Sequence, residues 1–166
     1  FPVPTPTAPY LDASSAIATV SDGSSFPVTN VIYVDRKKNV GGITFTAYVR
    51  SEDLGRELLP RVFVNLNAIS GVRWEDIGGG AALPASTFNE SRAISASLEA
   101  SQLSKPGCYQ VSLVATHHFD NRTQTPDPGD TGMVVWWMLI EDEPGSIKMS
   151  SCPGVPSPVT TDAGGD

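Results

Sequence analysis

The sequence predicts an all-β protein, and three of its features carry that prediction. Charged residues make up only 17% of the chain, below the usual quarter, and Ser, Thr, Gly, Pro and Asn replace them. Fifteen Gly and fourteen Pro in 166 residues argue against long helices. Several segments alternate apolar and polar residues with a period of two, which is typical of half-buried strands. The length suits one domain with a well-buried core.

Two proline-rich arms flank the expected domain. The first nine residues alternate proline with other residues and favour polyproline II, so we expect an N-terminal arm over residues 1–14. Residues 153–166 begin in the same way and end as a flexible acidic tail. The domain is therefore expected to span residues 15–152. The arms are either ordinary disordered termini or the means by which the domain reaches its neighbours.

The first half of the domain is expected to contain strands at Ser15–Val20, Val28–Asp35 and Ile43–Arg50. The last of these alternates most cleanly, which turns Ile43 and every second residue after it toward the interior. Ser51–Leu59 is expected to form one or two helical turns, because Ser51 is a good N-cap and acidic residues follow it.

The second half is expected to contain strands at Arg61–Asn67, Val72–Ile77, Arg92–Ala100, Tyr109–Thr116 and Gly132–Glu141. Trp74 is the candidate for the central aromatic of the core, and Gly78–Gly80 is expected to be a flexible turn. The last strand is apolar on both faces, so we expect both of its faces to be covered.

The stretch Leu98–Thr116, LEASQLSKPGCYQVSLVAT, joins a turn to a strongly alternating strand. A Pro-Gly turn at Pro106, an aromatic residue at Tyr109 and alternating apolar residues after it resemble the corner before the penultimate strand of immunoglobulin-like and PKD-like sandwiches. In that family a tyrosine hydroxyl ties the start of the strand to the preceding loop. The resemblance implies an immunoglobulin-like antiparallel β-sandwich of about seven to nine strands with Pro-rich terminal arms, and it implies no activity.

Cysteines and glycosylation motifs indicate an oxidising compartment. Cys108 and Cys152 are the only cysteines, and their places beside β-segments predict one disulfide, the alternative being two buried thiols in a cytosolic protein. Asn89 and Asn121 begin N-x-S/T motifs in expected loops, as in a glycoprotein. Residue 1 is Phe, so we expect a processed product or an excised piece. These observations predict a secreted protein, or one at a cell or virion surface.

The charge and hydropathy patterns argue against nucleic-acid binding and against a membrane span within these residues. A formal net charge of -7 and a pI near 4.7 argue against nucleic-acid binding, which needs clustered basic residues. No apolar run approaches the roughly 18 to 20 residues of a membrane span. The longest apolar run, Met133–Ile140, suits a single core strand.

The loop His117–Thr131 holds the candidate metal ligands. His117, His118 and Asp120 could serve a transition metal, but adjacent histidines that leave a strand point apart, so a solvated loop is the expected arrangement. Calcium is the better candidate, with Asp120, Asp127 and Asp130 as oxygen ligands, although their spacing matches no EF-hand. No other cofactor is expected.

Catalytic motifs are missing from the sequence. Neither histidine lies near a nucleophile elbow, and the Gly-x-Ser-x-Gly pattern does not occur. The acidic groups Glu75–Asp76 and Glu141–Glu143 are interpreted as solvated turns rather than as a pair for glycoside cleavage. We therefore expect no enzyme.

Trp136 and Trp137 give the clearest functional indication. Neighbours in a strand point to opposite faces, so one ring enters the core and the other needs a second cover, such as a terminal arm, another subunit or a glycan. The preferred interpretation is a structural or adhesive module that engages protein partners, including copies of itself, as in a secreted filament subunit or a protruding domain of a viral or phage coat. The alternative is a carbohydrate-binding module that uses an exposed Trp or Tyr.

Overall fold

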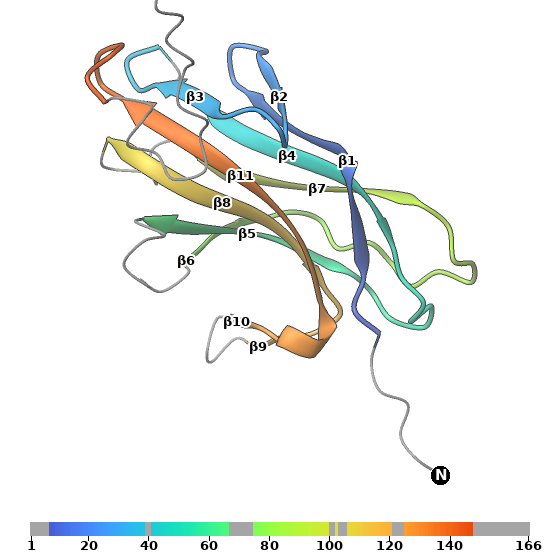
Figure 1. Cartoon of the computed structure of the whole chain (residues 1–166). Helices are drawn as coiled ribbons and strands as arrows, with labels where there is room; N and C mark the ends of the chain where they lie inside the picture. The colour runs from blue at the N-terminus through green and yellow to red at the C-terminus, as the bar shows by residue number, and fades with distance from the viewer. Residues whose placement is uncertain are drawn as a thin grey trace, which may run out of the picture.

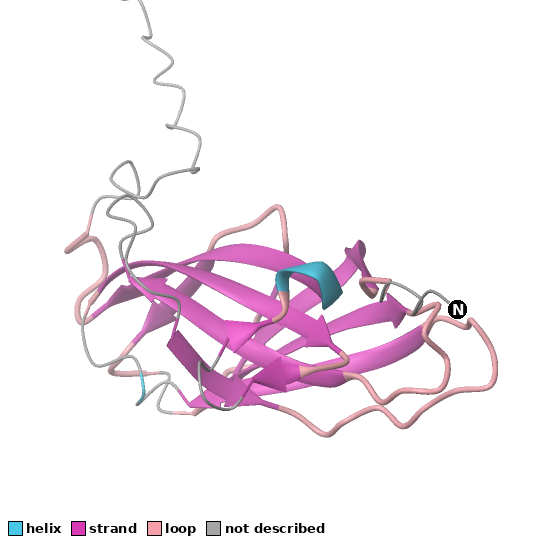
Figure 2. Cartoon of the chain, turned by 90° about the horizontal axis from the view of Figure 1, so that it is seen from below, coloured by secondary structure: helices cyan, strands magenta, loops and turns pink. Residues whose placement is uncertain are grey.

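A computed structural model describes residues 7–38, 41–66, 75–99, 102, 106–120 and 125–147 of the chain. This part is built from β-strands and contains the 3₁₀ helix η2 (Pro128–Asp130) but no α-helix (Figures 1 and 2). The strands are β1 (Tyr10–Val20), β2 (Ser25–Pro27), β3 (Ile32–Asp35), β4 (Gly42–Arg50), β5 (Leu59–Leu66), β6 (Glu75–Gly79), β7 (Arg92–Glu99), β8 (Gly107–Thr116), β9 (Phe119–Asp120), β10 (Thr125–Pro126) and β11 (Thr131–Glu141). The all-β prediction is confirmed.

The larger sheet is one nearly closed surface rather than two separate sheets. Its nine strands lie in the order β2-β1-β4-β7-β6-β5-β8-β11-β3. The described pairs are antiparallel except for β3, which runs parallel to β11. The sequence led us to expect two sheets facing each other. They are joined because β6 pairs with β5 along one side and with β7 through the single pair Gly79 and Ser97 on the other.

The two edges of this sheet belong to consecutive strands. β2 and β3 are joined by residues 28–31, so the chain itself bridges the opening between the first and last strands of the sheet (Figure 1). The expected strand Val28–Asp35 is therefore only half correct, because its first residues form this connection. Both edge strands are short, which limits the unpaired backbone that they offer to another chain.

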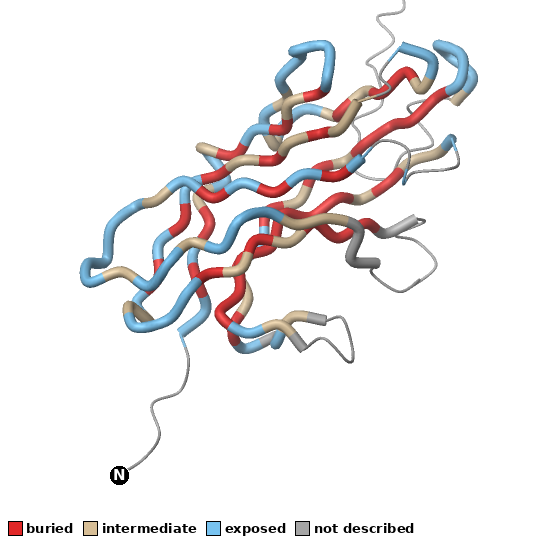
Figure 3. The backbone as a smooth tube through the Cα atoms, turned by 180° about the vertical axis from the view of Figure 1, so that it is seen from behind, coloured by how far each residue is buried: buried red, intermediate tan, exposed pale blue. Residues whose placement is uncertain are grey.

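The core lies inside the curled sheet, where the buried positions of the strands face one another (Figure 3). Ile43, Phe45, Ala47 and Val49 are the inward residues of β4, as the alternation predicts. Trp136 of β11 faces them and packs against Phe45, with the ring centroids 5.2 Å apart. Trp74, the predicted central aromatic, lies outside the described residues, so its place in the core stays a prediction.

The N-terminal segment is more ordered than the sequence indicates. β1 begins at Tyr10, so the end of the predicted arm already belongs to the sheet. Ile17–Thr19 pair with β4 on one side and with β2 on the other, which leaves no free edge here for a neighbouring chain.

Ser51–Leu59 forms turns instead of the expected helix, because the Ser51 hydroxyl bonds to His117 and Gly55 interrupts the segment.

The glycine triplet Gly78–Gly80 is not a flexible turn, as the sequence predicted. Gly78 and Gly79 end β6, where the two halves of the sheet approach each other closely. A Cβ atom on Gly78 would lie 2.2 Å from the Ser97 carbonyl oxygen, and one on Gly80 would lie 1.8 Å from that of Ser95. Glycine is needed because no side chain fits between these backbones.

Gly80→Ala is therefore expected to lower the free energy of unfolding by about 1 to 3 kcal/mol, because the backbones of β6 and β7 must separate. Urea denaturation followed by circular dichroism measures this difference. Gly55→Ala is the matched control, since a Cβ there meets no atom within 4 Å, and it should change stability little. Equal stability of the two variants would contradict the claim that the backbones at Gly80 and Ser95 lie too close for a side chain.

Glu141, interpreted from the sequence as part of a solvated turn, is only 2% exposed at the end of β11. It accepts hydrogen bonds from the Tyr33 hydroxyl at 3.0 Å, from the Gly145 amide at 3.0 Å and from the Ile147 amide at 2.7 Å. Burial alone raises the pKa of Glu141, but these three hydrogen bonds outweigh it and lower the pKa below its ordinary value of 4.5.

A lowered pKa in the folded state means that ionised Glu141 stabilises the fold. This contribution is complete above the ordinary carboxyl pKa and is lost as the pH falls through the lower pKa of the folded state. Glu141→Gln should therefore flatten the fall in melting temperature below about pH 5. Exposed Glu143→Gln should keep the steep profile of the natural chain, and identical profiles for both variants would refute the assignment.

Candidate functional site

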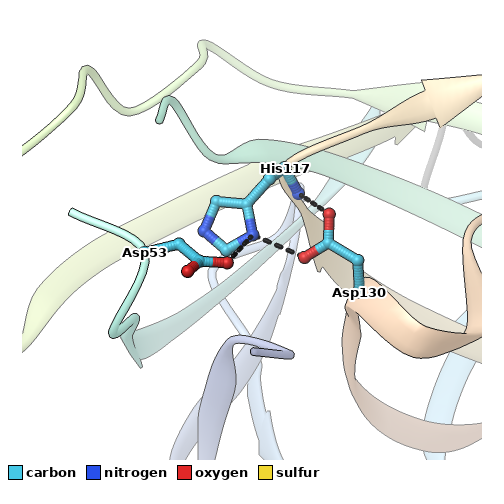
Figure 4. A group of neighbouring side chains, drawn as sticks. All are labelled: Asp53, His117 and Asp130. Atoms are coloured by element: carbon cyan, nitrogen blue, oxygen red, sulfur yellow. Dashed lines mark hydrogen bonds and ion pairs between the residues drawn. The ribbon is translucent and has the colours of Figure 1, made fainter. Parts of the chain in front are cut away.

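Four polar residues meet at one end of the core. In β4, β8 and β11 every second residue points into the core. Two residues beyond the last inward apolar residue, at this same end of the core, the residue is polar: Ser51 lies two positions after Val49, His117 two after Ala115, and Asp130 two before Gly132. Asp53 joins them from the loop after β4 (Figure 4). The apolar core is thus capped by a hydrogen-bonded cluster.

The imidazole of His117 is held from both sides. Its Nδ1 lies 2.5 Å from Oδ1 of Asp130 and 3.9 Å from Oδ2 of Asp53 (Figure 4). Its Nε2 lies 2.7 Å from the Ser51 hydroxyl. The His117 amide also donates to Asp130 Oδ2 at 3.2 Å. Because a carboxylate only accepts, Nδ1 carries the proton, and in the neutral ring Nε2 accepts from the Ser51 hydroxyl.

Ser51, His117 and Asp130 have the hydrogen-bond order of a nucleophilic triad. A triad needs the imidazole to reach the leaving group, so that Nε2 can return the proton that it took from the serine. The side chain of His117 is 0% exposed, and Ser51 is 9% exposed. The closed imidazole therefore favours a structural role for this cluster in stabilising the end of the domain.

The same groups are the candidate metal ligands among the described residues. Ligand atoms of Asp53, His117 and Asp130 lie within 4.8 Å of one another. Atoms bound to one zinc ion at about 2.1 Å lie roughly 3 Å or more apart. Nδ1 and the Asp130 oxygen are closer than that, so an ion would have to break their hydrogen bond. The geometry favours a hydrogen-bonded cluster over a metal centre.

A surface cleft of about 310 Å³ lies beside this cluster. Its walls are formed by Thr7, Ala8, Tyr10, Arg50, Ser51, Glu52 and Asn89. Ser51 belongs to both the cleft and the cluster. The Thr7 amide donates to Asp53 Oδ2 at 3.1 Å, so the cluster also holds the N-terminal wall of the cleft.

Two exposed tyrosines lie next to the cleft on the outer face of β1 and β4. Tyr10 is 66% exposed and Tyr48 is 51% exposed. In the register of these strands Tyr10 lies opposite Arg50, and Tyr48 lies opposite Asp12, so the two rings are diagonal neighbours. We call the cleft and these two rings the tyrosine surface.

The predicted calcium ligands have other partners where they are described. Asp127 Oδ1 accepts from the Gly129 amide at 2.9 Å and caps η2, and Asp130 binds His117. The side chain of Asp120 lies outside the described part, so the calcium site stays a prediction. His117 is buried rather than solvated, whereas His118 is exposed.

Trp136 and Trp137 lie on opposite faces of β11, as their adjacency predicts. Trp136 is 0% exposed, and its Nε1 donates to the Phe26 carbonyl oxygen at 3.2 Å. Trp137 is half-buried on the outer face, opposite Gln110. Its contact with a partner or a glycan stays a prediction.

The remaining predicted residues are only partly described. Asn89 is exposed and lines the cleft. Cys108 is the second residue of β8, but Cys152 and Asn121 lie outside the described residues. The disulfide and the use of the glycosylation motifs therefore stay predictions.

Comparison of the chain with models of known protein families finds no match, and comparison with curated protein sequences finds none either. Within the described ranges, no helix has the length and apolar character needed to cross a membrane.

Proposed function

We propose that this chain is an extracellular adhesion module that attaches to its partner through the tyrosine surface. The observation that carries the proposal is the exposure of two neighbouring aromatic rings, Tyr10 and Tyr48, beside a cleft. Exposed aromatic residues that gather with polar ones are typical of contact sites. The closed His117 side chain favours binding over catalysis as the role of this end of the domain.

We further propose that the domain belongs to the immunoglobulin-like sandwiches. The neighbouring strands β1-β4-β7 lie across the core from β5-β8-β11. In chain order these correspond to the A-B-E and C-F-G groups of immunoglobulin domains. Such domains serve many functions, so the fold supports adhesion only as one of them.

An extracellular or virion-surface location is part of the proposal. It is supported by the low charge content, the two N-x-S/T motifs and the predicted link between Cys108 and Cys152. Within this proposal the chain is either a subunit of a secreted filament or a protruding domain of a viral or phage coat. In either form, the partner would be a protein, including a second copy of this chain, or a glycan.

The test uses particles coated with the full chain. We expect them to attach to one another or to extracellular surface material, and we expect the double substitution Tyr10→Ala and Tyr48→Ala to abolish attachment. Thr19→Ala with Thr44→Ala, on the same sheet but away from the cleft, is the control. Equal attachment by the natural chain and the double tyrosine variant would overturn the proposal.

A further inference from the structure

We propose that the tyrosine surface binds a neutral glycan, an inference that rests on the proposed adhesive function. Flat aromatic faces pack against the C–H faces of sugar rings, and polar side chains around them bind the hydroxyl groups. The two diagonal tyrosines offer such faces on adjacent strands, where they can contact one sugar unit or two linked ones.

The polar groups of the cleft match the chemistry of sugar hydroxyls. A hydroxyl both donates and accepts a hydrogen bond, so a sugar needs donors and acceptors side by side. Arg50 supplies only donors, Glu52 only acceptors, and Asn89 both. All three side chains belong to exposed residues beside Tyr10, so they are open to a ligand.

The charges of this surface select against acidic glycans. Asp12 and Glu52 are acidic, and Arg50 is the basic residue among the cleft-lining residues. Arg50 also lies close enough to Asp12 to lower its pKa, after the larger effect of the hydrogen bonds from Ser14. With a net charge of -7 on the chain, a uronate or sialate would be repelled. The favoured ligand is therefore uncharged.

The floor of the cleft is fixed before any ligand arrives. Ser51, between Arg50 and Glu52, is bonded to buried His117, and the amide of Thr7, another lining residue, donates to Asp53. A site whose backbone is already held in place loses less conformational entropy on binding. The cluster thereby acquires a role in recognition, because its buried His117 holds the cleft-lining Ser51 in place.

The experiment uses the full chain produced without N-glycosylation, so that no sugar on Asn89 occupies the cleft. Calorimetry with manno-oligosaccharides, cello-oligosaccharides and chitotriose is expected to detect binding to at least one of them, and oligogalacturonate is expected not to bind. Tyr10→Ala and Tyr48→Ala should each weaken binding by about tenfold or more, whereas Tyr10→Phe should retain it. Arg50→Ala should also weaken binding, because it removes the donors of the cleft, whereas Arg56→Ala, at an exposed arginine in the next loop, should not.

Failure of this inference can be told apart from failure of the adhesive function. If attachment of coated particles survives periodate but not protease treatment, the partner is a protein and the glycan inference is wrong, while adhesion stands. The inference is also overturned if no neutral oligosaccharide binds the folded chain at millimolar concentration, or if the tyrosine substitutions leave binding unchanged.

Discussion

Replacing His117 with alanine is expected to lower the free energy of unfolding by about 3 to 5 kcal/mol. The substitution leaves Asp130, which is 2% exposed, without the imidazole that binds its Oδ1. It also removes the ring nitrogen that accepts from the Ser51 hydroxyl, which keeps only its bond from the Asp53 amide, and it opens a cavity at the end of the core. A buried carboxylate that loses its partner is strongly destabilising, because the charge cannot return to water without unfolding the region.

Urea denaturation followed by tryptophan fluorescence measures this loss, with an unchanged slope as evidence that the folded state is otherwise intact. His118→Ala provides the matched control, because the neighbouring side chain is exposed and should contribute less than about 0.5 kcal/mol. His117→Gln, which retains a donor and an acceptor, should recover part of the stability. Similar stabilities for His117→Ala and His118→Ala would show that the cluster does not stabilise the domain.

Trp136→Ala is the second substitution with a large expected effect, about 3 to 5 kcal/mol. The ring is completely buried between the two halves of the sheet, where it contacts Phe45, and its Nε1 binds the carbonyl oxygen of Phe26 in β2. Its removal leaves a large cavity and takes away the side-chain hydrogen bond that holds β2 against β11. The edge strand β2 should therefore loosen first, as local hydrogen exchange would show.

The neighbouring substitution Trp137→Ala separates core packing from surface contact. Trp137 is half-buried on the other face of the strand, so we expect a loss of only about 1 to 2 kcal/mol. Circular dichroism is the suitable readout for both variants, because fluorescence depends on the deleted rings. If the two variants are equally destabilised, Trp137 is a second core residue rather than a candidate contact for a partner.

Local alternation predicted most of the strands. Ile43–Arg50 and Arg92–Ala100 were predicted within one residue of β4 and β7, because their inward faces are continuously apolar. β2 was missed, since a strand of three residues that contains proline has no periodic signal. The joining of the two halves was missed for a different reason. It depends on close backbone contact at Gly78–Gly80, and a run of glycines in a sequence fits a flexible turn as well as such a contact.

The polar cluster was missed because its members lie just beyond the ends of the expected strands. Ser51, His117 and Asp130 each lie two positions beyond the last inward-facing apolar residue of a strand, so each keeps the same inward orientation. That continuation was available in the sequence as a signal of burial, but a polar residue at the end of a strand is more often solvated. Their meeting depends on the arrangement of the strands, which local patterns do not encode.

The parallel pairing of β3 with β11 has a consequence for the order in which the chain folds. Tyr33 and Glu141, which are joined by a hydrogen bond at this pairing, are 108 residues apart in the sequence. During synthesis, β3 must wait until nearly all of the described chain has left the ribosome before it gains its partner. Contacts between such distant segments slow folding, and the apolar faces of the earlier strands stay exposed until these contacts form. Premature termination before β11 would therefore yield an aggregation-prone product rather than a smaller stable domain.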